Sequence, residues 1–88
     1  MRLSKKGERI GAAILEVVDN QLRDNQPPET RLTIERLCKD GRSEVEAKRL
    51  IGAALSVEIY EVLKNKEAFN RDRYVKNLSR LPRMPWEK

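Results

Sequence analysis

The stretch Ser43–Asn65, SEVEAKRLIGAALSVEIYEVLKN, decides the fold of this chain. Ser43 and Glu46 have the spacing of a capping box, in which a hydroxyl and a carboxylate satisfy free backbone N–H groups at a helix start. Apolar residues then recur with helical spacing and, at about 100° per residue, cover more than half of the helix circumference. We therefore expect a central helix over residues 44–65, with a wide apolar stripe made of Ala47, Leu50, Ile51, Ala54, Leu55, Val57, Ile59, Val62 and Leu63.

Two helices are expected before this central one. The first covers residues 4–25, and its apolar face has i, i+3, i+4, i+7 spacing; the members of this face are Ile10, Ala13, Ile14, Val17, Val18 and Leu22. Pro27 and Pro28 stop it, because a proline disfavours helical geometry in the residue before it. The second covers residues 28–39, begins at a proline and ends before Gly41, which suits a left-handed terminating position. Its short apolar face is Ile34, Leu37 and Cys38.

A fourth helix is expected over residues 71–80, after Asn70 as N-cap. Phe69 and Tyr74 have the spacing of a hydrophobic staple around this cap. Prolines then prevent the helix from continuing, so residues 82–88 form an extended tail. The sequence predicts an all-α fold: a small single-domain bundle of about four helices over residues 1–88.

Composition excludes most catalytic chemistry. The chain has 88 residues, no histidine and one cysteine, so it lacks imidazole ligands, a Ser-His or Cys-His pair and room for a deep substrate cavity. We expect no enzymatic activity, no catalytic residues, no cofactor and no metal. Cys38 is expected to be a buried small hydrophobe, which fits a reducing cytoplasm. Neither a secretory signal nor a membrane-spanning segment is expected, because acidic residues interrupt the apolar runs.

About two thirds of the chain, residues 27–82, resembles a set of short bacterial helical proteins of unknown function. The resemblance rests on a Pro-Pro-Glu start, a Gly-x-Ser turn, an Ala-rich helix carrying Glu, and Phe and Tyr before Leu-Pro. It implies an all-helical fold and supplies no activity. Members carry a histidine at the position of Arg49, so a role of that histidine would not carry over. The matching positions are Pro28, Glu29, Gly41, Ser43, Glu46, Ala47, Ile51, Leu55, Glu58, Leu63, Phe69, Tyr74, Leu81 and Pro82.

Glu58 lies within the apolar stripe of the central helix, at a helical angle between those of Ile51 and Ala54. Burying an unpaired carboxylate costs several kcal/mol, so this side chain needs a partner. We expect an arginine or a cap on the backbone donors of another helix. The partner lies within the chain or, if Glu58 belongs to a protein interface, in another subunit.

Small residues occupy another side of the same helix. Gly52, Ala53 and Ser56 are flanked by Arg49 and Tyr60, the residue types that interfaces prefer as anchors. One interpretation is intramolecular packing, with the matching small residues of the first helix, Gly11 and Ala12, against this patch. The other is self-association, most simply as a homodimer, which would enlarge the core of a small chain.

The net charge of +5 lies at the chain ends: residues 1–9 and residues 67–88 each carry +3. On the fourth helix and the tail, basic side chains line one face, either as a solvated surface or as a contact for nucleic acid; they are Arg73, Lys76, Arg80 and Arg83. Trp86 stands among prolines and either folds back onto the bundle or docks to a partner. The sequence favours protein–protein contact, with Arg49, Ala53, Ser56, Glu58, Tyr60 and Trp86 as candidate contacts; nucleic-acid binding is the alternative.

Overall fold

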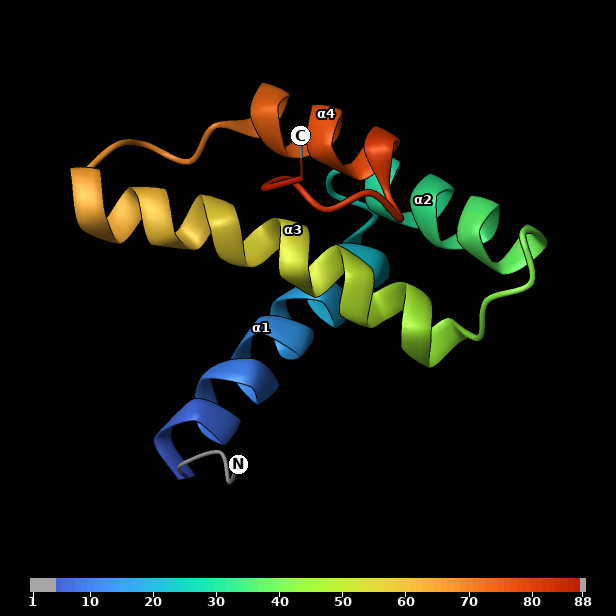
Figure 1. Cartoon of the computed structure of the whole chain (residues 1–88), viewed down its shortest axis with the longest axis horizontal. Helices are drawn as coiled ribbons and strands as arrows, with labels where there is room; N and C mark the ends of the chain where they lie inside the picture. The colour runs from blue at the N-terminus through green and yellow to red at the C-terminus, as the bar shows by residue number, and fades with distance from the viewer. Residues whose placement is uncertain (1–4, 88) are drawn as a thin grey trace.

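The structure is a computed structural model that describes the backbone of residues 5–87 and the side chains of residues 11–87. Within this part of the chain it contains four helices and no strand (Figure 1), so the expected all-α fold is confirmed. The expected start of the first helix at residue 4 lies outside the described residues. The helices are α1 (Lys5–Asp24), α2 (Pro28–Lys39), α3 (Glu44–Asn65) and α4 (Arg71–Arg80).

Side-chain caps start the third and fourth helices. The Ser43 hydroxyl accepts a hydrogen bond from the backbone N–H of Glu46 at 3.1 Å. Asn70 caps α4 in the same way, accepting from the backbone N–H of residue 73 at 2.9 Å. The rings of Phe69 and Tyr74 meet edge to face with their centroids 5.6 Å apart, which confirms the predicted staple. These contacts are local, which is why the sequence pattern placed both helix starts correctly.

Residues with left-handed backbone geometry end the first two helices. Gly41 has φ 97° and donates its N–H to the Cys38 carbonyl, while the N–H of Arg42 reaches the Leu37 carbonyl. These two hydrogen bonds form the Schellman motif, which satisfies the last free carbonyls of a helix. Asn25, with φ 51°, ends α1 before the two prolines.

α3 lies in the middle of the fold and packs against each of the other helices. In Figure 1, α2 and α4 lie above α3, while α1 crosses below it and its N-terminal part projects away. The core forms where these helices meet, and it includes one residue just beyond α4. Its fully buried apolar members are Val18, Leu37, Ala47, Ile51, Ala54, Leu55, Tyr74, Leu78 and Leu81.

Two polar arrangements connect helices that are distant in sequence. The side-chain oxygen of Gln21 accepts hydrogen bonds from the Thr30 and Tyr74 hydroxyls, both at 2.8 Å, and so joins α1, α2 and α4. Burial raises the pKa of the Tyr74 hydroxyl above its ordinary value, so the residue stays a neutral donor at physiological pH. From α2, the Arg36 guanidinium donates to the Leu81 carbonyl at 2.8 Å and to a second carbonyl of α4, which caps that helix from outside.

The prediction that Cys38 is buried is wrong: this thiol is exposed. Instead, Thr30 and Thr33 occupy buried positions on the inner face of α2 beside Leu37. The Thr33 hydroxyl donates to the Glu29 carbonyl at 2.7 Å, and Thr30 is paired with Gln21 as described above. Because both hydroxyls are satisfied, burial costs little, and α2 is rotated so that its cysteine faces outward.

Parts of the predicted apolar faces stay uncovered. Val18 is buried, but Ala13 and Val17 on the same helix are exposed. At the C-terminal end of α3, Leu63 is 75% exposed, although the sequence pattern placed it in the stripe facing the core. Three neighbouring helices cover only part of the circumference of α3, so the remaining apolar flank faces outward.

The chain after α4, which the sequence predicts as an extended tail, forms turns instead. The N–H of Arg83 donates to the Arg80 carbonyl at 2.9 Å, and the N–H of Glu87 donates to the Met84 carbonyl at 3.0 Å. Met84 packs against the core, while Trp86 is 64% exposed and has not folded back onto the bundle. No helix among the described residues is both long enough and apolar enough to cross a membrane.

Candidate functional site

Glu58 is held inside the fold by a bidentate arginine. Its carboxylate is 0% exposed, and it accepts from Arg73 Nε at 2.8 Å and from Arg73 Nη2 at 2.9 Å. Of the two expected partners, an arginine or a helix cap, the arginine is present, and it comes from α4 of the same chain. The hydrogen bond to Glu58 raises the pKa of the Arg73 guanidinium above its ordinary value, and burial opposes this shift. Glu67 lies 3.7 Å from the same guanidinium at the surface.

This arrangement corrects one candidate contact. Glu58 was grouped with the interface residues, but no part of its side chain reaches the surface of the chain. Both carboxylate oxygens already accept charge-assisted hydrogen bonds, the strong kind in proteins. Glu58 therefore joins α3 to α4 rather than forming part of a binding surface.

Gly52 is buried on the side of α3 that packs against α1. A Cβ atom on Gly52 would lie 3.4 Å from Ile14 Cγ2 and 3.7 Å from Leu15 Cδ2, which is about the limit of ordinary contact. Nearby, Lys48 Nζ lies 2.9 Å from the Asp19 carboxylate and ties the two helices together. The intramolecular interpretation is therefore correct for Gly52, but its neighbours on α1 are Ile14 and Leu15 rather than the predicted small residues Gly11 and Ala12.

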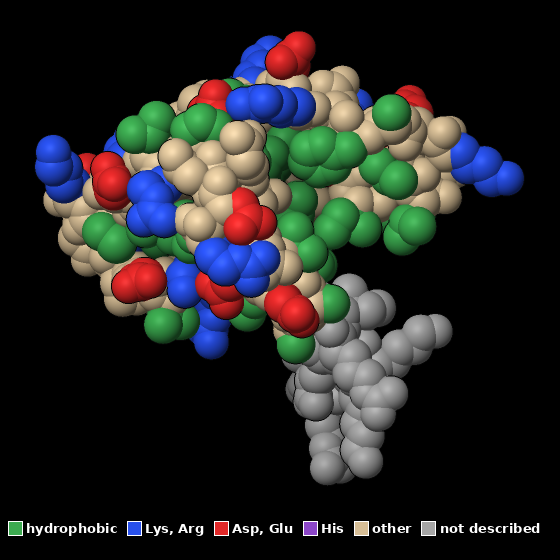
Figure 2. Space-filling model, turned by 180° about the vertical axis from the view of Figure 1, so that it is seen from behind, with side chains coloured by type: hydrophobic (Ala, Val, Ile, Leu, Met, Phe, Trp, Pro, Cys, Tyr) green, Lys and Arg blue, Asp and Glu red, His purple; other side chains and the backbone are tan. Residues whose placement is uncertain are grey.

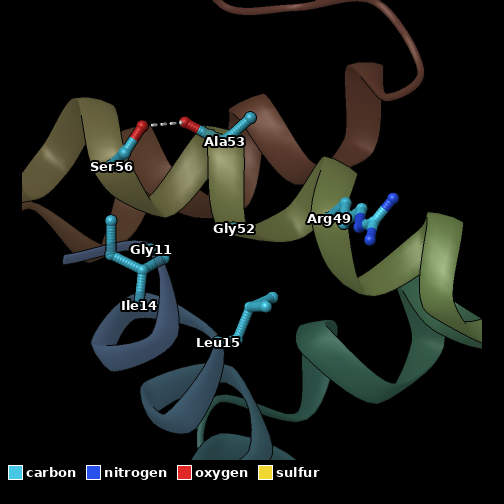
Figure 3. A pocket seen from close by; sticks show the side chains of 7 residues that line it. All are labelled: Gly11, Ile14, Leu15, Arg49, Gly52, Ala53 and Ser56. Carbon is cyan, nitrogen blue, oxygen red and sulfur yellow. Dashed lines mark hydrogen bonds between the residues drawn. The ribbon is translucent and has the colours of Figure 1, made fainter. Parts of the chain in front are cut away.

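The other small residues of this patch line an open groove beside that contact. The groove has a volume of about 310 Å³, and its α3 wall runs from Arg49 past Ala53 to Ser56 (Figure 3). The Ser56 hydroxyl donates to the Ala53 carbonyl at 2.7 Å, so it is satisfied within its own helix and the wall is mostly apolar. The α1 wall consists of Gly11, Ile14 and Leu15.

The groove continues into an exposed apolar area along α3. Tyr60 is 55% exposed, and Lys64 Nζ lies 5.2 Å from the centre of its ring. Leu63, three residues after Tyr60, is also exposed. Figure 2, which views the molecule from behind, shows hydrophobic side chains spread over the half that carries the C-terminal part of α3. Most of the charged side chains visible in this view lie on the opposite half.

We call the solvent-facing line of α3 the outer seam; it consists of Glu46, Arg49, Ala53, Ser56, Tyr60 and Leu63. The structure brings together four of the predicted contact residues on this seam, namely Arg49, Ala53, Ser56 and Tyr60. Sequence reasoning missed the α1 wall at Leu15. Its only signal was the position of Leu15 four residues after Gly11, and that spacing does not say what lies opposite.

The predicted basic strip is divided in two by the fold. The Arg73 guanidinium donates two hydrogen bonds to the buried Glu58 carboxylate, although its side chain is still 37% exposed. Lys76, Arg80 and Arg83 are exposed. The strip therefore offers fewer cations to phosphate than the sequence spacing suggested, since phosphate contact depends on accessible positive charge.

Comparison of the chain with protein-family models, with curated proteins and with solved structures found no match. The resemblance to short bacterial helical proteins therefore stays a prediction. Within residues 11–87, no group of three or more Cys, Asp or Glu side chains has an arrangement that could hold a metal ion.

Proposed function

We propose that this chain is a non-catalytic helical module that acts through protein–protein contact and pairs with a second copy of itself. The observation that carries the proposal is the outer seam and its groove, where Tyr60 and Leu63 are mostly exposed beside small residues. Large apolar side chains gathered on one surface mark contact sites more often than single exposed ones. The surface fits a partner helix, because the groove is open and mostly apolar.

The chemistry of this surface supports the same proposal. Arg and Tyr are enriched among the anchors of protein interfaces, and Arg49 and Tyr60 lie about three helical turns apart on one face. A domain of this size buries only about 60–65% of the surface that its unfolded chain exposes, which is less than a larger domain buries. Pairing would cover Leu63 and Leu15 and so add to the apolar area removed from water.

Trp86 offers a separate contact for a different partner. It stands 64% exposed in the turn after Met84, away from the core residues that hold the tail. An indole presented in this way suits burial against another protein, because it combines a large apolar area with one N–H donor. We assign it to contact with another protein, not to pairing between copies.

The test of self-association uses one variant on the seam and one away from it. Tyr60→Glu places a charge in the proposed contact, and we expect the dissociation constant of the dimer to rise at least about 100-fold in sedimentation velocity, as for an interface anchor. Leu32→Glu is the matched control, because Leu32 lies on α2 and is 62% exposed; it should leave self-association unchanged. A strict monomer across micromolar concentrations of the unmodified chain, or equal effects of both variants, would contradict the proposal.

The alternative function, nucleic-acid contact, can be tested directly. In fluorescence anisotropy titrations with mixed-sequence nucleic acid, we expect no binding tighter than about 10 μM at about 50 mM salt. The variant Lys76→Gln/Arg80→Gln/Arg83→Gln is suited to this test, because it removes the exposed cations and spares Arg73, on which the fold depends. Tighter binding that falls steeply toward about 200 mM salt, and that this variant abolishes, would favour nucleic acid over protein contact.

A further inference from the structure

We propose that α3 pairs antiparallel with α3 of a second copy, across a two-fold axis that lies outside the seam, level with the midpoint between Ala53 and Ser56. This inference rests on the proposed function, because it specifies how the two copies meet. In a two-fold interface each contact occurs twice: if residue i of one copy meets residue j of the other, then j of the first meets i of the second. The seam must therefore be complementary to itself when it is read in reverse.

The spacing of the outer seam suits a paired helix. Its members recur at steps of three, four, three, four and three residues from Glu46 to Leu63. Alternation of three and four keeps side chains on one nearly straight line along a helix and is the pattern by which two helices pack over several turns. Every member of the seam is exposed or half-buried, so this line is free on the surface of the chain.

The order of side chains along the seam is complementary when reversed. Antiparallel pairing about the middle of α3 places Ala53 opposite Ser56 of the second copy at the centre, where small residues let two helices approach closely. One step outward, Arg49 comes opposite Tyr60. A guanidinium over an aromatic ring is a favourable contact, and it would occur twice.

At the ends of the seam the charges are complementary as well. Glu46 comes opposite Leu63 and beside Lys64, whose ammonium group already lies over the Tyr60 ring of its own chain. Parallel pairing would instead place Glu46 against Glu46 and Arg49 against Arg49. Like charges facing each other are unfavourable, so the seam chemistry selects the antiparallel orientation.

The described side chains of α1, residues 11–24, leave the seam open for this pairing. It packs on one flank of α3, where Ile14 meets Gly52 and Asp19 meets Lys48. The seam lies on the neighbouring flank, and the groove between α1 and α3 opens next to it (Figure 3). The helix of the second copy would lie along this groove and cover Leu15, which forms part of its wall.

Disulfide cross-linking distinguishes the orientation of the pair. In a Cys38→Ser background, we would prepare Glu46→Cys and Lys64→Cys as separate proteins, oxidise each alone, and oxidise an equimolar mixture. Antiparallel pairing brings the two different cysteines together and separates identical ones by about 25 Å, at 1.5 Å per helical residue. A disulfide requires Cα atoms within about 7 Å. We therefore expect cross-linked dimer mainly in the mixture.

The outcomes separate this inference from the proposed function. A monomer in sedimentation overturns both. A dimer that cross-links in the single-variant samples, or in none, overturns the antiparallel pairing and leaves self-association standing. As a second measurement, Glu46→Lys and Lys64→Glu alone should each raise the dimer dissociation constant several-fold, and the double exchange should restore it. An additive loss in the double variant would also overturn the antiparallel arrangement.

Discussion

Arg73→Met is expected to lower the stability of this chain, because Arg73 is the hydrogen-bonding partner of a buried carboxylate. The change leaves the Glu58 carboxylate enclosed between α3 and α4 without the two hydrogen bonds it now accepts. A buried carboxylate that loses its partner is strongly destabilising, and access of water from the Arg73 side of the pair, where that side chain is 37% exposed, reduces the loss. We expect the urea midpoint at neutral pH to fall sharply, or the variant to be unfolded without denaturant.

The control for this prediction removes both partners. Glu58→Leu/Arg73→Met replaces the ion pair by apolar side chains, and such replacements are often neutral or stabilising. The double variant should therefore recover most of the loss. If Arg73→Met unfolds at the same urea concentration as the unmodified chain, the carboxylate must have another partner or access to water, and the pair would not hold α3 to α4.

Ile51→Ala should destabilise the fold and Leu63→Ala should not, although both residues belong to the apolar stripe predicted for α3. Ile51 is fully buried in the core, so its truncation removes packed methyl groups and is expected to cost about 2–5 kcal/mol of unfolding free energy. Leu63 is mostly exposed, so its truncation should change unfolding by no more than about 0.5 kcal/mol. The same change should weaken self-association, because it removes an apolar contact from the seam.

Two measurements distinguish these outcomes: urea unfolding at low protein concentration and sedimentation velocity at higher concentration. Ile51→Ala should lower the unfolding midpoint, while Leu63→Ala should raise the dimer dissociation constant and leave the midpoint unchanged. Equal losses of stability would mean that Leu63 packs within the chain. No change in association for Leu63→Ala would remove it from the contact surface.

The location of the site was partly predictable from the sequence. Arg49, Ala53, Ser56 and Tyr60 share one side of a helix whenever that helix forms, so periodicity alone placed them together. Glu58 illustrates the limit: its position in the stripe predicted a buried carboxylate and an arginine partner, but not which arginine. Arg73 is on a different helix, and its spacing with the other basic residues of α4 instead suggested a surface strip.

The orientation of α2 was not predictable in this way. The apolar pattern alone predicted that Cys38 faces the core, whereas in the structure Thr30 and Thr33 face the core and Cys38 is exposed. The deciding contact is the hydrogen bond from Thr30 to Gln21 on α1, since a buried hydroxyl is tolerated only when it has a partner. No pattern within α2 reveals that partner.

The sequence by itself determined the four helices and their ends, because caps, prolines and left-handed residues act on backbone groups only a few residues away. It also determined which residues lie together on each helix face. Only the tertiary structure decided which faces are buried, that Arg73 neutralises Glu58 inside the fold, and that Leu15 forms a wall of the groove. These outcomes depend on which helices meet, and the distances between helices are set by the packing of the whole chain.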